Sequence, residues 1–460
     1  MASNTSNNTV AVILAAGMGT RMKSSLPKVL HPLLGEPMIT YVVRALEEAG
    51  VSHIVAVLGQ GGDQVEKALG DRIRPVYQNE QLGTGHALLT ALPELAKLEA
   101  DDCLVVCGDT PLLSGDTLAA LRKERTDKQA RAALLTAIVD DPKGYGRILR
   151  KDGKVSAVVE EKDADEDQRR INEINAGAYC FDLKLLPEAL EGLAPANAQG
   201  EYYLPDIIEW FTSRGQGAAS FQAPCADEAL GINDRVQLAA AQDILRRRIL
   251  EGHMREGVTV EEPSATLVGP LVKIGRDTVL ETGCQLLGNT VIGEACHIGP
   301  RSRIIDSRVG GGTVVNQSQI TECETGEGCD IGPFTYMRPG CALADNVKAG
   351  AFVEMKKAVV AEGAKVPHLS YMGDCSVGAG SNIGAGTITC NFDGKVKSQT
   401  TIGENVFIGS NSNLVAPVTI GDGAYTAAGS TITQDVPANS LGIARGKQAN
   451  IIDWRLKAGK

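Results

Sequence analysis

Aromatic side chains are scarce in this sequence. Phe, Trp and Tyr together make up 4% of the 460 residues, whereas glycine occurs 52 times. The apolar fraction of 43% is ordinary, so the chain has enough apolar side chains to bury a full core. Because an ordinary mixed core uses more aromatic residues and less glycine, we expect much of the chain to have a different architecture.

The sequence also lacks paired cysteines and long apolar runs. Its 11 cysteines are an odd number and include no C-x-x-C pair, which favours buried, reduced thiols. No apolar run reaches the roughly 18 residues of a membrane span. Residues 1–10 are polar, without the apolar region of a signal peptide. We therefore expect a cytoplasmic protein with no membrane partner.

An excess of positive charge is absent as well. The net charge is −11, which argues against nucleic acid and anionic membranes as partners. Anionic substrates would therefore need a local group of cations. One such group follows within nine residues of Gly19 and consists of Arg21, Lys23 and Lys28.

The stretch before these cations predicts a site for a polyphosphate. Val10–Leu14 is a short run rich in β-branched residues and predicts a buried strand. The small residues of Ala15–Thr20 let a backbone approach a ligand closely, and the cations that follow complement phosphate. The loop is neither a Walker A motif nor a Rossmann fingerprint, because both consensus spacings are broken. A tight turn with surface cations is the alternative.

Residues 10–232 alternate apolar runs with helical stretches. The expected strands are Val10–Leu14, His53–Leu58, Arg74–Tyr77, Cys103–Cys107 and Ala132–Val139. The expected helices are Met38–Gly50, Thr84–Ala100 and Thr117–Arg125. This order predicts an α/β domain with a doubly wound, Rossmann-like sheet that binds ligands at the carboxyl ends of its strands. A mixed segment, Arg147–Phe181, is expected to cover one edge.

From about residue 257 the pattern changes to a period of six. Aliphatic residues recur at Ile274, Leu280, Leu286, Ile292, Ile298 and Ile304. A period of six excludes a helix, whereas three hexads close one triangular coil and successive coils stack about 4.8 Å apart. We expect breaks at Arg308–Val315, Glu354–Tyr371 and Cys390–Ser398, where loops and sites should lie. Arg235–Arg255 is predicted to be a single linking helix.

The first loop resembles the signature of sugar-1-phosphate nucleotidyltransferases. It contains Leu-Ala-Ala-Gly-x-Gly-Thr-Arg-Met followed by Leu-Pro-Lys, and the resemblance implies that Lys28 contacts phosphate. Asp109 resembles the metal-binding aspartate of this family and Asn233 its second ligand, which implies Mg²⁺. Alone, Asp109 would be read as a turn residue and Asn233 as a helix N-cap.

The same resemblance implies how the base and the sugar are bound. Gln78 begins a segment similar to the uracil-reading one, and its amide has the donor and acceptor that a pyrimidine edge needs. Gly146, Glu160 and Asn175 match positions that hold N-acetylglucosamine. The full implied set for the nucleotide and UDP-sugar is Leu14, Ala15, Ala16, Gly17, Gly19, Arg21, Lys28, Gln78, Gly83, Thr84, Gly146, Glu160, Asn175 and Asn233.

The repeats resemble the hexapeptide, left-handed parallel β-helix of acyltransferases. A lone histidine is more often structural, but a neutral His368 could take a proton from an amine nucleophile. The sugar-phosphate residues implied are Arg338, Lys356, Tyr371 and Asn382. Those implied for acetyl-CoA are Ala385, Asn391, Phe392, Ser410, Ala428 and Arg445. The family commonly has Tyr where this chain has Phe392, so a hydroxyl is missing there.

Nearly the whole chain resembles a bacterial family of bifunctional enzymes. The resemblance implies that residues 257–460 transfer acetyl from acetyl-CoA to glucosamine 1-phosphate. The tetrahedral oxyanion of this step needs a hydrogen-bond donor, for which our hypothesis is Ser410 or a backbone N–H near Ala385. The resemblance also implies that residues 1–234 then join the product to UTP, giving UDP-N-acetylglucosamine and pyrophosphate. Residues 235–256 would be the linker, and the β-helix would assemble a homotrimer.

Two alternatives stay open at this point. The β-helix of a nucleotidyltransferase could serve only for oligomerisation, which the placing of Lys356, His368 and Asn382 argues against. The chain could also be a non-catalytic regulatory or scaffold protein, and the intact Arg21, Lys28 and Asp109 argue against this.

Overall fold

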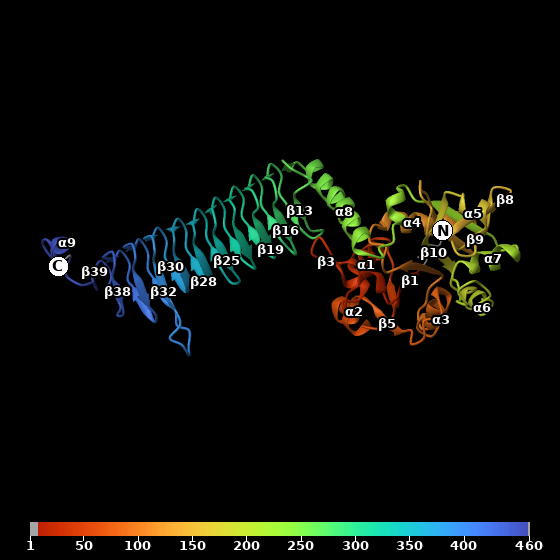
Figure 1. Ribbon diagram of the computed structural model, residues 1–460, viewed down its shortest axis with the longest axis horizontal. Helices are drawn as coiled ribbons and strands as arrows, with labels where there is room; N and C mark the ends of the chain where they lie inside the picture. The colour runs from red at the N-terminus through yellow and green to blue at the C-terminus, as the bar shows by residue number, and fades with distance from the viewer. Residues whose placement is uncertain (1–7, 459–460) are drawn as a thin grey trace, which may run out of the picture. The chain divides into compact units, whose positions relative to one another are not determined.

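The computed structural model describes residues 8–458, which form two compact units (Figure 1). The units divide after Leu245, inside helix α8 (Arg235–Arg255), whose predicted bounds are confirmed. The first seven residues of the polar N-terminal stretch lie outside the described part. No helix within residues 8–458 is both long and apolar enough to cross a membrane.

The first unit is built on a nine-stranded, mostly parallel sheet. The order along its main path is β11-β7-β10-β6-β1-β4-β5, with the β8–β9 hairpin attached to β10. These strands are β1 (Thr9–Ala15), β4 (His53–Leu58), β5 (Arg74–Tyr77), β6 (Asp102–Cys107), β7 (Ala132–Ile138), β8 (Arg147–Lys151), β9 (Lys154–Val159), β10 (Glu173–Asp182) and β11 (Ala218–Gln222). The five predicted strands and the doubly wound sheet are confirmed. Strand β10 lies inside the sheet, between β6 and β7 and antiparallel to both, so the prediction that its mixed segment covers one edge is wrong for this strand.

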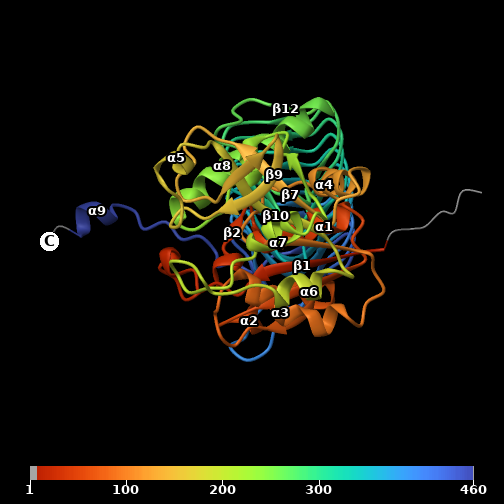
Figure 2. The same cartoon turned by 90° about the vertical axis from the view of Figure 1, so that its right-hand side faces the viewer.

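Helices cover both faces of this sheet, as Figure 2 shows with α1 and α4 set apart from α3 and α6. In β1, Ala11 and Ile13 face the core with α1 and α4, whereas Val10 and Val12 face the core with α3, α6 and α7. The helices are α1 (Met38–Glu48), α2 (Gly62–Leu69), α3 (Thr84–Leu95), α4 (Gly115–Asp127), α5 (Glu166–Arg169), α6 (Leu186–Glu191) and α7 (Asp206–Ser213).

Helix α3 is shorter than predicted and α2 was not predicted. Helix α3 ends at Leu95 instead of Ala100, because the chain turns tightly there and Leu98 N donates to Leu95 O. That turn lets Leu98 pack against the core on the α3 side of the sheet.

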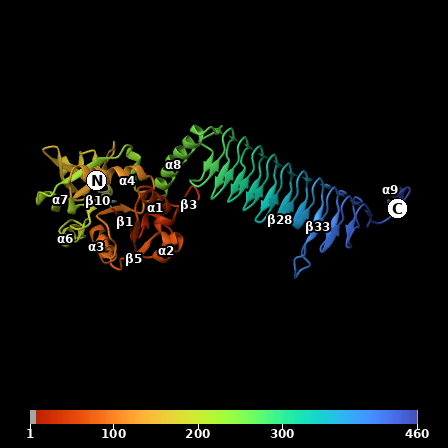
Figure 3. The same cartoon turned by 180° about the vertical axis from the view of Figure 1, so that it is seen from behind.

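The second unit is a parallel β-helix, which confirms the architecture predicted from the hexads. Leu267 pairs with Gln285 and Gln285 with Arg303, so one coil takes three hexads. One face is an 11-stranded sheet from β12 (Thr259–Val260) to β39 (Leu441–Gly442), and the other two faces join in a 17-stranded sheet. Figure 3 shows the coils following one another from green to blue.

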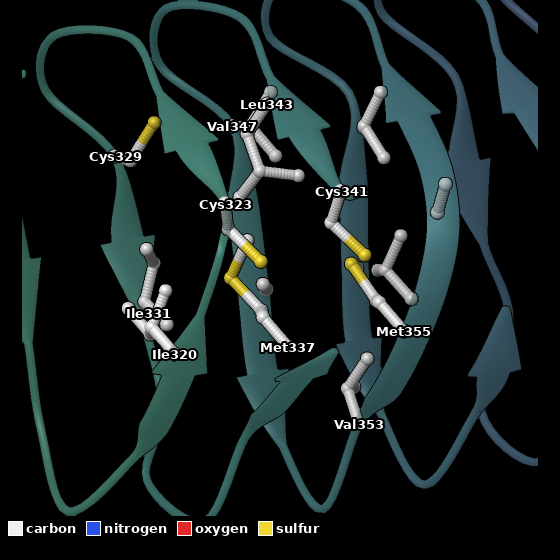
Figure 4. Close-up of a cluster of buried hydrophobic side chains, with 14 of the residues drawn as sticks. Ile320, Cys323, Cys329, Ile331, Met337, Cys341, Leu343, Val347, Val353 and Met355 are labelled. Atoms are coloured by element: carbon white, nitrogen blue, oxygen red, sulfur yellow. The ribbon is translucent and has the colours of Figure 1, made fainter. Parts of the chain in front are cut away.

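A second inward position, two residues before each hexad aliphatic, was not predicted. It holds small residues, among them six buried cysteines: Cys284, Cys296, Cys323, Cys329, Cys341 and Cys375. Cys323 and Cys341 belong to neighbouring coils, and Figure 4 shows both side chains pointing into the interior. Serine, threonine, alanine or valine fills the same position elsewhere, and Thr278 Oγ1 donates to Gly293 O over 2.9 Å. All 11 cysteines are free and most are buried, as the composition predicted.

Two of the three predicted breaks in the solenoid are wrong. Val291 pairs with Arg308 and Ala342 with Val359, so these coils continue but are one residue short of three hexads. When a coil has one residue fewer, the aliphatic residues after it no longer fall at multiples of six from those before it. In the sequence this change of phase resembles an interruption of the repeat. The third break is confirmed, because Cys375 pairs with Thr400 and the chain between them is longer than three hexads. The extra residues form a loop over 391–398, which projects from the coils in Figure 1.

The second inward position generates a prediction about Cys296, which stacks between Thr278 and Thr313. Cys296→Leu should lower the free energy of unfolding by about 1–3 kcal/mol, because two extra heavy atoms overfill a buried corner. Cys296→Thr should cost less than about 1 kcal/mol, since a hydroxyl there reaches a carbonyl of the next coil. Urea unfolding followed by circular dichroism compares the two variants. Equal stability of the two would contradict the size limit at this corner.

Candidate functional site

A cavity of about 310 Å³ opens at the carboxyl ends of β1 and β6. Nine residues predicted from the sequence line it: Leu14, Ala15, Ala16, Gly17, Lys28, Gln78, Gly83, Thr84 and Asp109. The lining also includes Gln81, Cys107 and Glu201, which the sequence analysis missed. Cys107 could have been found from its place at the end of the strand before Asp109, whereas Glu201 comes from a distant segment.

The two glycines of the loop have different roles. A Cβ built on Gly17 would meet no atom within 4 Å, so this glycine leaves open space beside the cavity. Gly19 has φ +59°, and a Cβ there would come within 2.6 Å of Lys28 Cβ. Gly19 therefore shapes the loop, while Gly17 leaves room for a ligand to approach the backbone.

Two side-chain oxygens converge on the ammonium group of Lys28. Lys28 forms an ion pair with Asp109, and its Nζ lies 3.3 Å from Asn233 Oδ1. Arg21 Nη2 also donates to Asn233 Oδ1, over 2.8 Å. Ile232 N donates to Asp109 O over 2.9 Å, which ties the segment before α8 to the end of β6. The N-cap of α8 is Asp234, whose carboxylate accepts from Gln237 N, so the N-cap alternative for Asn233 is wrong.

This pair of oxygens fits a hard cation that takes its remaining ligands from phosphate and water. Among residues 8–458 no cluster of three or more His, Cys, Asp or Glu side chains could hold a metal ion. A divalent ion bound here would therefore depend on the nucleotide for much of its coordination.

The segment predicted to read the base is held against residues 201–204. Gln78 is only 5% exposed, and its Nε2 donates to Gly83 O over 3.2 Å. Tyr202 N donates to Leu82 O over 2.8 Å, and Gly85 N donates to Tyr202 O over 2.7 Å. Gly83 has φ +107°, and a Cβ there would lie 2.6 Å from Tyr202 O, so only glycine fits. Gln81 Nε2 adds a bond of 2.7 Å to Ala16 O in the glycine loop.

The three residues predicted to hold the sugar lie together. A Cβ on Gly146 would approach Glu160 Oε1 to 3.3 Å and Asn175 Cβ to 3.5 Å. Asn175 Nδ2 donates to Tyr179 OH over 2.7 Å at a bulge in β10. Burial, reinforced by Asp206, raises the pKa of Glu160. Burial raises the pKa of Cys107, and the nearby carboxylates of Asp109 and Glu160 raise it further. Because Cys107 lines the cavity, the cluster that contains Glu160 adjoins the cavity.

In the β-helix, three cations gather where a phosphate was predicted. Arg338 of β25 (Tyr336–Arg338) is in register with Lys356 of β28 (Glu354–Val360). Lys397, from the projecting loop, lies beside Lys356 and lowers its pKa, with Arg338 adding to the effect. Sequence reasoning missed Lys397, because only the fold brings this loop back to β28. Tyr371 lies one coil further on, and its OH comes close to Gly373.

His368 ends β29 (Lys365–His368) on another face of the coil. Its side chain is exposed, and its carbonyl accepts a bond of 2.8 Å from Ser370 Oγ. Asn382, at the start of β31 (Asn382–Ile383), pairs with Lys365 of the same face. The structure therefore places the predicted base at the corner that leads to Tyr371.

The residues predicted for acetyl-CoA divide into two groups. Ala385, Ser410 and Ala428 occupy the same place in three successive coils, and Arg445 Nη1 donates to Ala428 O over 2.9 Å. Asn391 and Phe392 lie apart from them at the base of the projecting loop. Asn391 Nδ2 donates to Asp374, and Phe392 is 57% exposed. Several coils separate His368 from Arg445 within one chain.

The two loop glycines generate a paired prediction. Gly17→Ala should leave stability within about 0.5 kcal/mol of the parent protein but raise KM for the nucleotide at least about tenfold, because the new methyl group occupies ligand space. Gly19→Ala should instead lower the free energy of unfolding by about 1–3 kcal/mol, because it combines positive φ with a clash. Thermal melts and nucleotide titrations distinguish the two. Destabilisation by Gly17→Ala would contradict the open space.

Two family models match the chain. The model for the MobA-like NTP transferase domain matches residues 11–171, and the model for the bacterial transferase hexapeptide (six repeats) matches residues 399–434. These matches agree with the cavity in the first unit and with the coils of the second.

Similar proteins extend the match over nearly the whole chain. A protein from Heliobacterium modesticaldum named bifunctional protein GlmU is 52% identical over 438 residues, covering 95% of each chain. The protein of the same name from Listeria welshimeri is 50% identical over 453 residues, covering 98% of this chain and 99% of its own. With half of its residues identical to these proteins over nearly its full length, the chain belongs to the GlmU family of bifunctional proteins.

Proposed function

We infer that this chain carries two transferase activities that together produce UDP-N-acetylglucosamine. An acetyltransferase acts on glucosamine 1-phosphate with acetyl-CoA, and a uridylyltransferase joins N-acetylglucosamine 1-phosphate to UTP. The observation that carries the proposal is that cations gather at two separate places, one beside a glycine loop and one on a β-helix. We assign the uridylyl transfer to residues 1–234, the link to residues 235–256 and the acetyl transfer to residues 257–460.

In the first unit, the phosphate oxygen of N-acetylglucosamine 1-phosphate attacks the α-phosphorus of UTP in line and displaces pyrophosphate. Arg21 and Lys28 orient the triphosphate and neutralise its charge, while the loop from Leu14 to Gly19 offers backbone N–H groups. Gln78, Gly83 and Thr84 hold the base. Gly146, Glu160 and Asn175 hold the sugar, so the chain contributes mainly positioning and charge.

Asp109 and Asn233 would hold a divalent ion, for which we propose Mg²⁺, and the bound ion supplies positive charge to the phosphates. The convergence of their oxygens on the Lys28 ammonium supports this assignment. Lys28 would then turn from Asp109 toward the nucleotide.

In the second unit, His368 takes the proton of the glucosamine amine as the nitrogen attacks the thioester carbonyl. The tetrahedral oxyanion then collapses and breaks the C–S bond, and the departing sulfur of coenzyme A takes up the proton held by His368. Arg338, Lys356 and Lys397 bind the sugar phosphate, with Tyr371 one coil further on, and Asn382 contributes from the face that carries His368. Ser410, exposed one coil beyond Ala385, is the proposed oxyanion donor. Ala428 and Arg445 extend the acetyl-CoA surface along the corner, with Asn391 and Phe392 contributing from the loop.

We propose that the acetyl site is completed between chains of a homotrimer. His368 and Arg445 do not meet within one chain, although both are assigned to the same reaction. An exposed apolar ridge stacks beside His368: the rings of Phe334 and Phe352 lie 5.1 Å apart, and Leu369 follows in the next coil. Such a ridge is typical of a subunit contact. Because UTP and acetyl-CoA are the co-substrates, we place the protein in the cytoplasm.

The two sites should fail independently. Asp109→Ala should abolish uridylyl transfer by removing an oxygen ligand and leave acetyl transfer within about twofold of the parent enzyme. His368→Ala should do the reverse, lowering acetyl transfer by about 10²–10⁴-fold. Separate assays for coenzyme A release and pyrophosphate release measure the two steps. The assignment is wrong if either variant, still folded, loses both activities.

The shared acetyl site can be tested by mixing inactive chains. His368→Ala and Arg445→Ala chains, unfolded and refolded together, should regain acetyl transfer to about one quarter of the parent activity, because random assembly leaves that share of sites with both groups intact. Each variant refolded alone serves as the control. Mixed oligomers confirmed by native mass spectrometry but lacking activity would place both groups in one chain.

A further inference from the structure

We propose that His86 is a positioning residue that sets the base selectivity of the nucleotide cavity by holding the Gln78 amide in one orientation. The inference rests on the proposed uridylyl transfer and deepens it. His86 lies in the first turn of α3 and was not singled out by any sequence pattern. It lines a neighbouring cavity with Leu89 and Tyr202, whereas Gln78 lines the nucleotide cavity.

The contacts of Gln78 Nε2 fix which end of its amide is the donor. This nitrogen lies 3.2 Å from Gly83 O and 2.9 Å from His86 Nδ1. A carbonyl oxygen can only accept, so the amide NH₂ must face Gly83, and a flipped amide would set two oxygens against each other. The second NH₂ hydrogen then points to His86 Nδ1, which must accept and leaves the ring proton on Nε2.

With both hydrogens engaged, the amide presents its oxygen as the free group. Within residues 8–458 the structure records no donor to Gln78 Oε1. An amide oxygen complements the N3–H of uracil, whereas cytosine has a lone pair at N3. The orientation imposed by Gly83 and His86 therefore favours uracil over cytosine.

The frame around this pair is rigid enough to sustain the selection. Gln78 is buried, and Gly83 is held in place by the backbone of Tyr202. The rings of His86 and Tyr202 lie with centroids 6.5 Å apart, which limits how the imidazole can turn. When cytosine binds, the buried Gln78 amide oxygen has neither a ligand donor nor water as a partner. Binding of the wrong base therefore costs more free energy here than it would at an exposed group.

The test compares UTP with CTP in the full-length enzyme by kcat/KM. His86→Leu removes the acceptor while keeping bulk, and it should lower the UTP-to-CTP ratio about tenfold, mainly through KM for UTP. His86→Asn can place an amide oxygen near the position of Nδ1 and should retain the ratio within about threefold. Leu89→Ala is the matched control, because it alters the same neighbouring cavity without touching Gln78, and it should leave the ratio unchanged.

A double-mutant cycle decides whether His86 acts through Gln78. In a Gln78→Ala background, His86→Leu should produce no further fall in the ratio. An equal loss of activity with both nucleotides, or a full effect of His86→Leu without Gln78, would overturn the inference and show a merely structural role. A parent enzyme that turns over neither nucleotide while retaining acetyl transfer would instead overturn the proposed uridylyl transfer.

Discussion

The contact between the Lys28 ammonium and the Asp109 carboxylate is the interaction on which the first site depends. It joins the glycine loop after β1 to the end of β6, and Asn233 brings in the segment before α8. The close approach of Gly19 to Lys28 Cβ fixes the path of the loop between them. Groups from three distant parts of the chain therefore meet at one point, beside the cavity proposed to bind a triphosphate.

The second unit is organised differently, because its interior is repetitive and its proposed functional side chains lie on the outer surface. The coils repeat an inward residue, usually aliphatic, and a second inward residue no larger than valine two positions earlier, so neighbouring coils stack in register. Outward residues are then aligned along the axis, as Arg338 is with Lys356. Cations that are distant in sequence become neighbours, and Lys397 joins them from a loop. The repeated packing of inward residues thus brings outward side chains from successive coils close together.

Sequence patterns predicted the strands, the linking helix and the period of six, because each depends on local alternation of apolar residues. The resemblance located Asp109, Lys28 and Gln78, which the cavity brings together. It could not locate His86 or Lys397, because their roles come from contacts across loops. The two false breaks have a physical cause as well: a coil that is one residue short shifts the hexad phase but keeps the backbone pairing, as at Arg308. The spacing of apolar residues in the sequence is therefore a poor guide to strand pairing between coils wherever a coil has one residue fewer.

The loop over 391–398 shows what this architecture permits. Ser398 N donates to Asn391 O over 2.9 Å, closing the loop at its base, and pairing resumes at Thr400 as though the extra residues were absent. The backbone pairing of the coils on either side does not involve the loop, which contacts them through the bond from Asn391 to Asp374. The rest of the loop can therefore change in length and sequence without altering the pairing of the coils. Changes in this loop during evolution could therefore alter the proposed acetyl-transfer site without changing the residues that stack the coils of the β-helix.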